Sequence, residues 1–595
     1  MKKKVISILL CLILVMSMFS GCSKENNGKD VSKTNETSDS NTGSNADNAQ
    51  GAAKYKDFIT VDVFDSQANY QGIQSGWFAK IIKDKFNMEL NIIAPNVAGG
   101  GDTLLQTRSA AGNLGDLIFT STASGRLQDL VTAGLVQDMT NLMKGKENLA
   151  KYQDAVDFTN KKMVKDPGVW AIPSEVSERP ATTRMGGTTL NFGTYIRWDL
   201  YKQLGYPKMS TLEDLLPVMK NMQDMAGKSD SGKKVYAFSI FKDWDGDFMK
   251  AANEMASMYG YAPMGFVYAK ADDSAEPQSA LDDDSLYIRG LKFYFQANQM
   301  GLLDPESTTQ NYDTLSNKYK DGAVLYSPWP WLSSAYNTTE HTSAGKAFNT
   351  AAIDDFKLYA WGCYSKGNPN NAVMIGSKAK DPQRLMDFVD WLYSPEGLEV
   401  AYAGSISGIK DLMWNVVDGK PALTDFGYQC MTNGDKTAMP EEYGGGNYAD
   451  GIERLNYKVV GDGEINPETG FSYNYQFWDS YVNINLTDVE KDWQAHMKAK
   501  NAAEFFDANK QIVVSPGSGY AVPSEKSDIT TIRSQIKSTI VEYSWKAVFA
   551  KDEAEFNKLI KDMKDTAIGL GYNDVIAIDK ANVEQQKQER IAVSK

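Results

Sequence analysis

Two hydrophobic periods alternate between residues 58 and 120, and this alternation limits the possible fold more than any other feature of the chain. Apolar residues at every second position, or in a short continuous run, predict strands, and apolar residues at helical spacing predict helices. These patterns predict strands over 59–63, 88–93 and 116–120, and helices over 77–86 and 102–111. Such an order requires parallel strands joined by right-handed crossovers. The sequence therefore predicts an α/β fold.

Polar or glycine-rich stretches follow the three predicted strands. In an open parallel sheet, ligands bind beyond the carboxyl ends of the strands. Asp65, Asn69 and Asp102 lie in these stretches and are candidate hydrogen-bond partners for a ligand. Each of them is also the residue type expected at a helix cap or in a turn.

The N-terminus has the order of a secretory signal. Three lysines at 2–4 precede an apolar run over 5–19, and two small residues then precede Cys22. The run is shorter than the roughly 20 residues that a membrane-spanning helix needs. We therefore expect residues 1–21 to be a signal peptide that is removed.

A polar segment follows Cys22. Residues 23–50 contain no Leu, Ile, Met or aromatic residue. Such a segment cannot bury enough apolar surface to offset the entropy lost on ordering. We interpret residues 22–54 as a flexible tether.

Composition excludes several functions. The chain has a net charge of −14, which becomes −17 when the three signal lysines are lost, so binding to nucleic acid through phosphates is not expected. Only Cys363 and Cys430 remain besides Cys11 and Cys22, and we favour two buried free thiols over one disulfide. With no CxxC motif and only two histidines, no metal or other cofactor is expected.

The end of the signal resembles a bacterial lipobox, with Phe19 where that pattern usually has Leu. The resemblance implies a diacylglyceryl group on Cys22 and anchoring at the extracytoplasmic face of the bacterial cell membrane. The alternative is an ordinary secretion signal with an incidental cysteine.

The mature chain resembles the extracellular solute-binding lipoproteins of sugar ABC importers, and in particular a long subgroup of them. The resemblance is carried by LGDLIFTST (Leu114–Thr122), LNFGTYIRWDLYKQLGYPKMSTLEDL (Leu190–Leu215), DGAVLYSPWPW (Asp321–Trp331), DPQRLMDFVDWLYSPEG (Asp381–Gly397) and the C-terminal segment Thr539–Ile576. It implies a monomer that catalyses nothing and delivers a carbohydrate to the permease subunits of an ABC transporter.

The resemblance also implies a two-lobed type II periplasmic-binding-protein fold, with a hinge and a ligand cleft between the lobes. The expected ranges are 55–185 and 365–415 for the first lobe, and 186–364 and 416–595 for the second. Some long members carry a calcium loop, but residues 226–238 lack several of its acidic ligands. The DWDGD stretch from Asp243 to Asp247 is interpreted as a solvated turn.

A carbohydrate site needs aromatic faces to cover the C–H patches of sugar rings, and polar groups to bind the hydroxyls. Trp329 and Trp331 are the strongest candidates, because they follow an apolar strand and Pro330 between them interrupts it. The other candidates are Trp361, Tyr364, Tyr326, Trp244, Glu175, Arg184 and Arg197. Arg197 is as readily explained by an ion pair with Asp199, and Trp391 and Trp545 lie in apolar helical stripes typical of a core.

Two other functions stay open from the sequence. A lipid-anchored glycan-degrading enzyme could use paired carboxylates, but no pair stands out among the acidic residues. A receptor for a sensor kinase would bind sugar without transport. Chain length and aromatic content favour an oligosaccharide over a monosaccharide, and a peptide or another solute remains an alternative.

Overall fold

The computed structural model describes residues 54–98, 102–187, 189–401, 406–461, 463–482, 486–520 and 522–595. Contacts divide the chain into Met1–Asp47 and Asn48–Lys595, and all described residues belong to the second unit. The expected signal peptide, the lipidated Cys22 and nearly all of the tether thus lie outside the described residues. Within the described ranges, no helix is long and apolar enough to cross a membrane.

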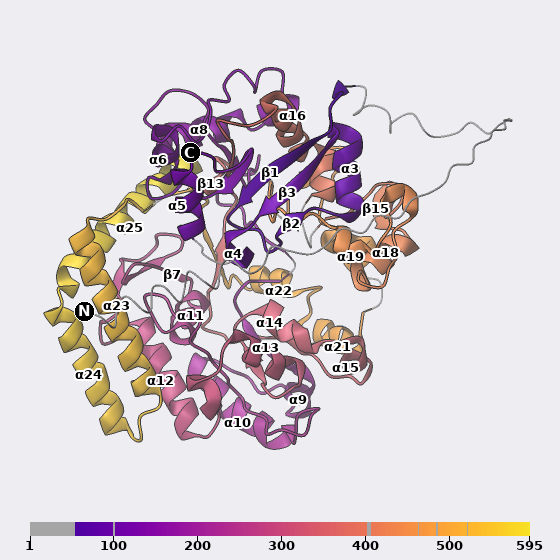
Figure 1. The fold of residues 1–595 in the computed structure, drawn as a ribbon. Helices are drawn as coiled ribbons and strands as arrows, with labels where there is room; N and C mark the ends of the chain where they lie inside the picture. The colour runs from indigo at the N-terminus through magenta and orange to yellow at the C-terminus, as the bar shows by residue number, and fades with distance from the viewer. Residues whose placement is uncertain are drawn as a thin grey trace, which may run out of the picture. The chain divides into compact units, whose positions relative to one another are not determined.

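The first core is built on a six-stranded sheet of order β2-β3-β1-β4-β13-β5 (Figure 1). Its strands are β1 (Ile59–Asp65), β2 (Gly72–Ile73), β3 (Met88–Ile93), β4 (Leu117–Thr120), β5 (Ile172–Ser174) and β13 (Asn368–Ile375). Strand β1 pairs in parallel with β3 and β4, while β13 is antiparallel to β4 and β5. The three predicted strands and their parallel pairing are confirmed.

Helices predicted over the same region are also present, as α3 (Gly76–Phe86) and α5 (Asp102–Ala110). Helix α3 buries Trp77 and Phe86, and Phe86 makes edge contacts with Phe388 and Trp391 of α16 (Pro382–Leu392). The carboxylate of Asp381 accepts the N–H of Arg384 at 3.1 Å and so caps the start of α16. Trp391 is buried, as predicted.

The second core is mainly helical. Its buried side chains come from α10 (Leu215–Ala226), α11 (Lys250–Met258), α12 (Leu286–Gln299), α23 (Ser527–Val548) and α24 (Glu553–Gly569). It also contains a three-stranded antiparallel sheet of order β10-β6-β11, formed by β6 (Thr194–Arg197), β10 (Tyr326–Ser327) and β11 (Phe348–Ala351).

The spacing of Ser210 and Glu213 predicts a capping box before α10, but the box lies one residue later. Thr211 and Asp214 form the box around the short helix η1 (Leu212–Asp214). Glu213 instead makes a bidentate ion pair with Arg289, at 2.8 and 2.7 Å. Ser210–Glu213 and Thr211–Asp214 have the same spacing, so the local sequence cannot choose between them. The ion pair of Glu213 with Arg289 decides in favour of Thr211 and Asp214.

Several chain segments connect the two cores. Strand β12 (Leu358–Trp361) pairs in parallel with β18 (Ile512–Ser515), and isolated bridges join Arg184 to Gly362 and Val176 to Tyr364. The C-terminal helix α25 (Tyr572–Ser594) packs against α23 and α24 (Figure 1). Lys162 of α8 (Gln153–Met163), in the first core, forms an ion pair with Glu589 of this helix.

The residues that directly follow 416 belong to a different core than the expected boundary assigns them to. The buried side chains of Cys430, Tyr448 and Tyr457 belong to the first core, not to the second. Tyr448 stacks on Trp77 of α3, with ring centres 5.7 Å apart. The chain thus returns to the second core only at α21 (Asp488–Met497). Cys363 and Cys430 are both free and buried, as predicted.

Candidate functional site

Four aromatic side chains gather beside β10 and form what we call the aromatic cluster: Trp244, Tyr312, Trp329 and Trp331. The rings of Trp329 and Trp331 stack with centres 5.7 Å apart and planes inclined by 25°. Trp244 stacks on Tyr312 at 4.9 Å and lies 5.6 Å from Trp331. Of the two tryptophans after β10, Trp331 is 46% exposed and Trp329 only 8%, while Trp244 is 39% exposed.

Pro330 explains why the two neighbouring tryptophans differ in burial. It begins the short helix α14 (Pro330–Ser333), so the strand ends before it, as predicted. Ser327 accepts the N–H of Trp329 and donates its hydroxyl to the Trp329 carbonyl, which fixes the turn. The Trp329 ring is held among buried apolar side chains. Trp331 lies one residue into the helix and keeps an exposed indole face.

Trp244 is held by carboxylates on either side of it. Asp243 accepts the backbone N–H of Tyr312 at 2.9 Å, at the start of α13 (Tyr312–Lys320). Asp245 accepts the N–H of Lys250 and the indole N–H of Trp545. Burial raises the pKa of the Asp245 and Asp247 carboxyls. The DWDGD stretch is a turn, as predicted, with Asp243 and Trp244 exposed to solvent and with Asp245 and Asp247 partly buried.

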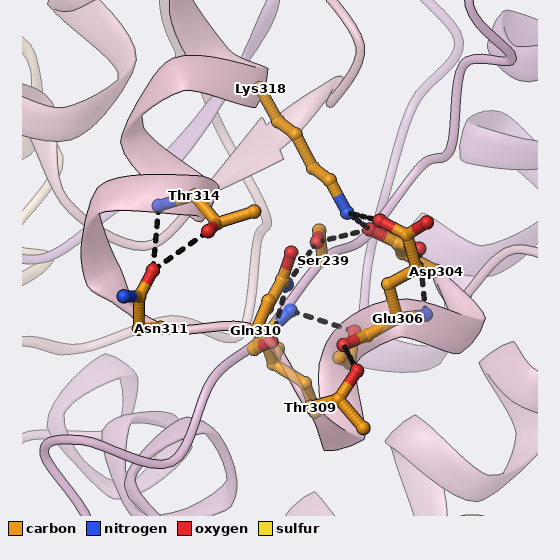
Figure 2. A network of polar contacts seen from close by, with 10 residues as sticks. Ser239, Asp304, Glu306, Thr309, Gln310, Asn311, Thr314 and Lys318 are labelled. Atoms are coloured by element: carbon orange, nitrogen blue, oxygen red, sulfur yellow. Dashed lines mark hydrogen bonds and ion pairs between the residues drawn. The ribbon is translucent and has the colours of Figure 1, made fainter.

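A polar network beneath this loop ties α13 to the segment that leads into it (Figure 2). Lys318 of α13 donates to Asp304 at 2.6 Å and to Glu306 at 2.7 Å. The same Asp304 carboxylate accepts the hydroxyl of Ser239, and the Gln310 amide donates to that hydroxyl at 2.7 Å. The network holds together the two segments that carry Trp244 and Tyr312.

No cluster of three or more metal-binding side chains occurs among the residues that the structure describes. In the 226–238 loop, the Asp321 carboxylate accepts the hydroxyls of Ser229 and Ser231, each at 2.7 Å, and the backbone N–H of Ser231. The Asp321 carboxylate is therefore already hydrogen-bonded by donors of this loop.

The Asp65 carboxylate lies at the carboxyl end of β1, fully buried. One oxygen accepts the N–H groups of Gln67 and Ala68, at 2.8 and 3.0 Å. The other has no hydrogen-bond partner within the described part of the chain. Burial raises the pKa of this carboxyl to about 8. Asn69 is exposed beside it, and the side chain of Asp102 lies outside the described residues.

Four further candidates lie where the chain passes between the cores. Glu175 adopts φ +49° and accepts the amide of Asn368 at 2.6 Å. Arg184 donates to the carbonyl of Gly187, and burial lowers its pKa. Tyr364 lies near Glu175, and burial is the main cause that raises its pKa. Trp361 ends strand β12.

Phe192 links Trp361 to the aromatic cluster. Its ring centre lies 5.9 Å from that of Trp361, and its side chain also packs against the apolar group that contains Trp329. The structure thus brings Trp244, Trp329 and Trp331 together and connects them through Phe192 to Trp361. Asp65 and Asn69 lie apart from them, on the first core.

Tyr326 and Arg197 lie inside the second core. Tyr326 is 4% exposed. Arg197 forms a bidentate ion pair with Asp199, both distances 2.8 Å, and its guanidinium lies over the ring of Tyr336 at 4.4 Å. Arg197 is buried and the Asp199 side chain is only 11% exposed, so the geometry is that of a structural ion pair.

Tyr312 and Phe192 belong to the site but were not among the sequence candidates. Tyr312 follows the cap residue Asn311 at the start of α13, a position where the pattern shows only a helix start. Phe192 precedes β6 in a stretch without apolar periodicity. The neighbouring sequence of Tyr312 and of Phe192 gives no sign that either ring lies at or beside the aromatic cluster.

No protein-family model matches the chain, and no curated protein matches its sequence. Solved structures do match. The Streptococcus pneumoniae ABC-transporter substrate binding protein FusA in complex with kestose has a TM-score of 0.57 at 15% identity, over 89% of this chain and 99% of that chain. An ABC-transporter-associated solute binding protein of Bifidobacterium longum infantis that binds HMO has a TM-score of 0.54 at 14% identity, over 89% and 99%.

Alginate-binding protein AlgQ2, in a structure without calcium ion, has a TM-score of 0.53 at 14% identity, over 88% of this chain and 98% of that chain. At such identities the likeness establishes the fold. This chain has the fold of ABC-transporter solute-binding proteins, spread over nearly the whole length of each of these three. The predicted resemblance to carbohydrate solute-binding proteins is confirmed at that level.

Proposed function

We propose that this protein is an extracytoplasmic, lipid-anchored solute-binding protein that captures an oligosaccharide and delivers it to an ABC importer. The aromatic cluster is the observation that carries the proposal. Trp331 and Trp244 present exposed indole faces, which cover the C–H patches of sugar rings, on a fold that FusA uses with kestose. A fixed, partly exposed aromatic surface costs little conformational entropy when a ligand binds.

In this proposal the two cores are lobes, and the segments that connect them act as the hinge. A ligand on the aromatic cluster would be covered from the first lobe by Asp65 and Asn69, with Glu175, Arg184 and Tyr364 near the hinge.

The test is calorimetric titration of purified protein with kestose and with neutral oligosaccharide ladders of glucose, mannose and xylose units. Trp331→Ala is expected to weaken binding about tenfold, since it removes one exposed stacking face. Phe58→Ala is the matched control, because Phe58 is an aromatic residue with the same 46% exposure outside the site. Equal affinities for wild type and Trp331→Ala would remove the aromatic cluster as the site.

The competing functions give different outcomes in the same samples. Release of reducing ends or unsaturated products during the titration would show that the protein is a glycan-degrading enzyme and not a binding protein. Deletion of the gene is expected to abolish uptake of a labelled oligosaccharide. Unchanged uptake with lost gene induction would favour a receptor for a sensor kinase.

The lipid anchor is tested by fractionation. Cys22→Ala is expected to move the protein from the membrane to the medium, because the acyl chains attach at this thiol. Cys11→Ala, in the apolar run of the signal, is the control that should stay with the membrane. A Cys22→Ala protein that remains with the membrane would contradict the anchor.

A further inference from the structure

Two neighbouring pockets share a wall formed by Tyr428 and Tyr481, and we call them together the tyrosine groove. The first pocket has a volume of about 420 Å³ and lies between these tyrosines and helix α21. The second, of about 320 Å³, lies beside α18 (Asp425–Thr432) and α20 (Asp479–Val482). Both volumes fall in the range of small-molecule sites, roughly 300–1,000 Å³.

The tyrosine groove lies at the same end of the three-stranded sheet as the aromatic cluster. Tyr195 of β6 lines the groove and pairs with Ser327 of β10, the strand that leads into Trp329. Thr189 also lines the groove, while Phe192 packs against the apolar group of Trp329. Thr189 and Phe192 are three positions apart, so their Cα atoms lie within about 11 Å of each other. The groove and the apolar group that contains Trp329 therefore lie close together along this segment.

The lining of the groove suits sugar hydroxyls. Gln494 donates one amide N–H to the Lys500 carbonyl, and the Asn501 oxygen accepts the N–H of Glu504. Each amide keeps further polar atoms that can bind a hydroxyl. The indole N–H of Trp493 is fixed on the Thr350 carbonyl at 2.7 Å, which holds this ring in place.

The groove has a small excess of negative charge. Its lining contains two acidic residues, Glu490 and Asp425, and one basic residue, Lys500. The Glu490 carboxylate is already engaged by the N–H and hydroxyl of Thr487 in a capping box. Asp425 lies at the start of α18, in the second pocket. An excess of positive charge, which an anionic glycan would require, is absent from this lining.

We propose that the tyrosine groove binds the units of a neutral oligosaccharide that extend beyond those held by the aromatic cluster. The inference rests on the proposed function and adds to it a class of ligand, a neutral chain of several sugar units. Tyr481 is the central residue, since it lines both pockets and its ring is held edge-on against Tyr475 at 4.7 Å.

The experiment compares short and long members of the same neutral oligosaccharide ladders by calorimetry. Wild-type affinity is expected to rise with chain length. Tyr481→Ala should lose about fivefold to tenfold on the longest members and stay within about twofold on the shortest. Trp331→Ala should weaken all members. Tyr481→Phe, which keeps the ring packing, controls for folding, together with the melting temperature of each variant.

Thr189→Trp provides a second variant that does not depend on removing a packed ring. Thr189 is exposed, so a larger side chain fills the groove without disturbing a core. It should reproduce the selective loss on long members. Two results would contradict binding of the ligand in the tyrosine groove. One is unchanged affinity of both variants for the long members, and the other is an equal loss of affinity for short and long members.

Failure of the proposed function gives a different result. If Trp331→Ala binds normally while Tyr481→Ala loses long members, the aromatic cluster fails and the groove stands. If anionic ladders bind more tightly than neutral ones at the groove, the ligand class is overturned. A wild-type protein that binds no member of any ladder overturns both proposals.

Discussion

Asp65 connects burial of one carboxyl to the pH dependence of the whole protein. Its pKa is about 8 when folded, against roughly 3.9 in an unfolded chain. A raised carboxyl pKa means that the native state favours the protonated form, so its contribution is fully present below pH ~4 and is lost as pH rises through 8. Asp65→Asn removes this titration while keeping the shape of the group.

We therefore expect Asp65→Asn to gain stability relative to wild type, by a few kcal/mol, between pH 5 and pH 8. Urea unfolding of both proteins across that range measures the difference. Asn69→Asp, exposed beside it, is a useful comparison because it adds a carboxyl in water. Parallel stability curves for wild type and Asp65→Asn would contradict a buried, titrating carboxyl.

Single residues also show what the sequence could predict of the site. Pro330 marks the end of a strand in any context, and so Trp329 and Trp331 could be selected beforehand. Which of the two indoles would be buried depends on apolar neighbours from other segments, including Phe241 and Leu315. Tyr326 was selected only because it lies near a predicted strand end, and the sheet places it inward.

At the scale of elements, helix α13 depends on one ion pair. The Lys318 ammonium meets Asp304, whose side chain is only 3% exposed. Lys318→Met leaves that carboxylate without its cation and should cost about 3 kcal/mol of unfolding free energy. It should also weaken ligand binding, because Tyr312 begins this helix. Denaturation and calorimetry measure the two effects.

Lys320→Met is the matched control on the same helix, since Lys320 is exposed. It should change the unfolding free energy by less than about 0.5 kcal/mol. Equal stability of the two variants would show that the network in Figure 2 contributes nothing to holding α13.

Elements with strong local signals were predicted well. The helices over 77–86 and 102–111 follow from local spacing alone, and the same holds for the caps at Asp381 and at Asp552, which accepts the Glu555 N–H at 2.9 Å. The segment after residue 416 could not be assigned in the same way. Cys430 of α18 is buried in the first core, whose sheet lies mostly hundreds of positions earlier, while the hairpin β14 (Trp414–Val417) to β15 (Lys420–Leu423) packs against Trp478. Periodicity reports which face is buried, not which core buries it.

At the scale of the molecule, the end of α25 forms hydrogen bonds and ion pairs with segments that are distant from it in the sequence. The buried Arg590 guanidinium donates to Asp273 at 2.8 Å and to the Ser515 hydroxyl at 2.9 Å. Arg590→Met should therefore speed hydrogen exchange in the last turns of α25 and in β18, by about tenfold or more. Lys580→Met, at an exposed position on the same helix, should leave exchange unchanged. Similar exchange in both variants would contradict the anchoring role.

This arrangement sets an order for assembly. A chain that emerges N-terminus first supplies β1, β3 and β4 early, but β13, between β4 and β5, arrives some 250 positions later. Glu589 and Arg590, which contact α8 and β18, emerge later than all strands of this sheet. Until β13 is present, β4 and β5 each lack it as a neighbour, so the nascent protein must be kept from aggregation over this interval.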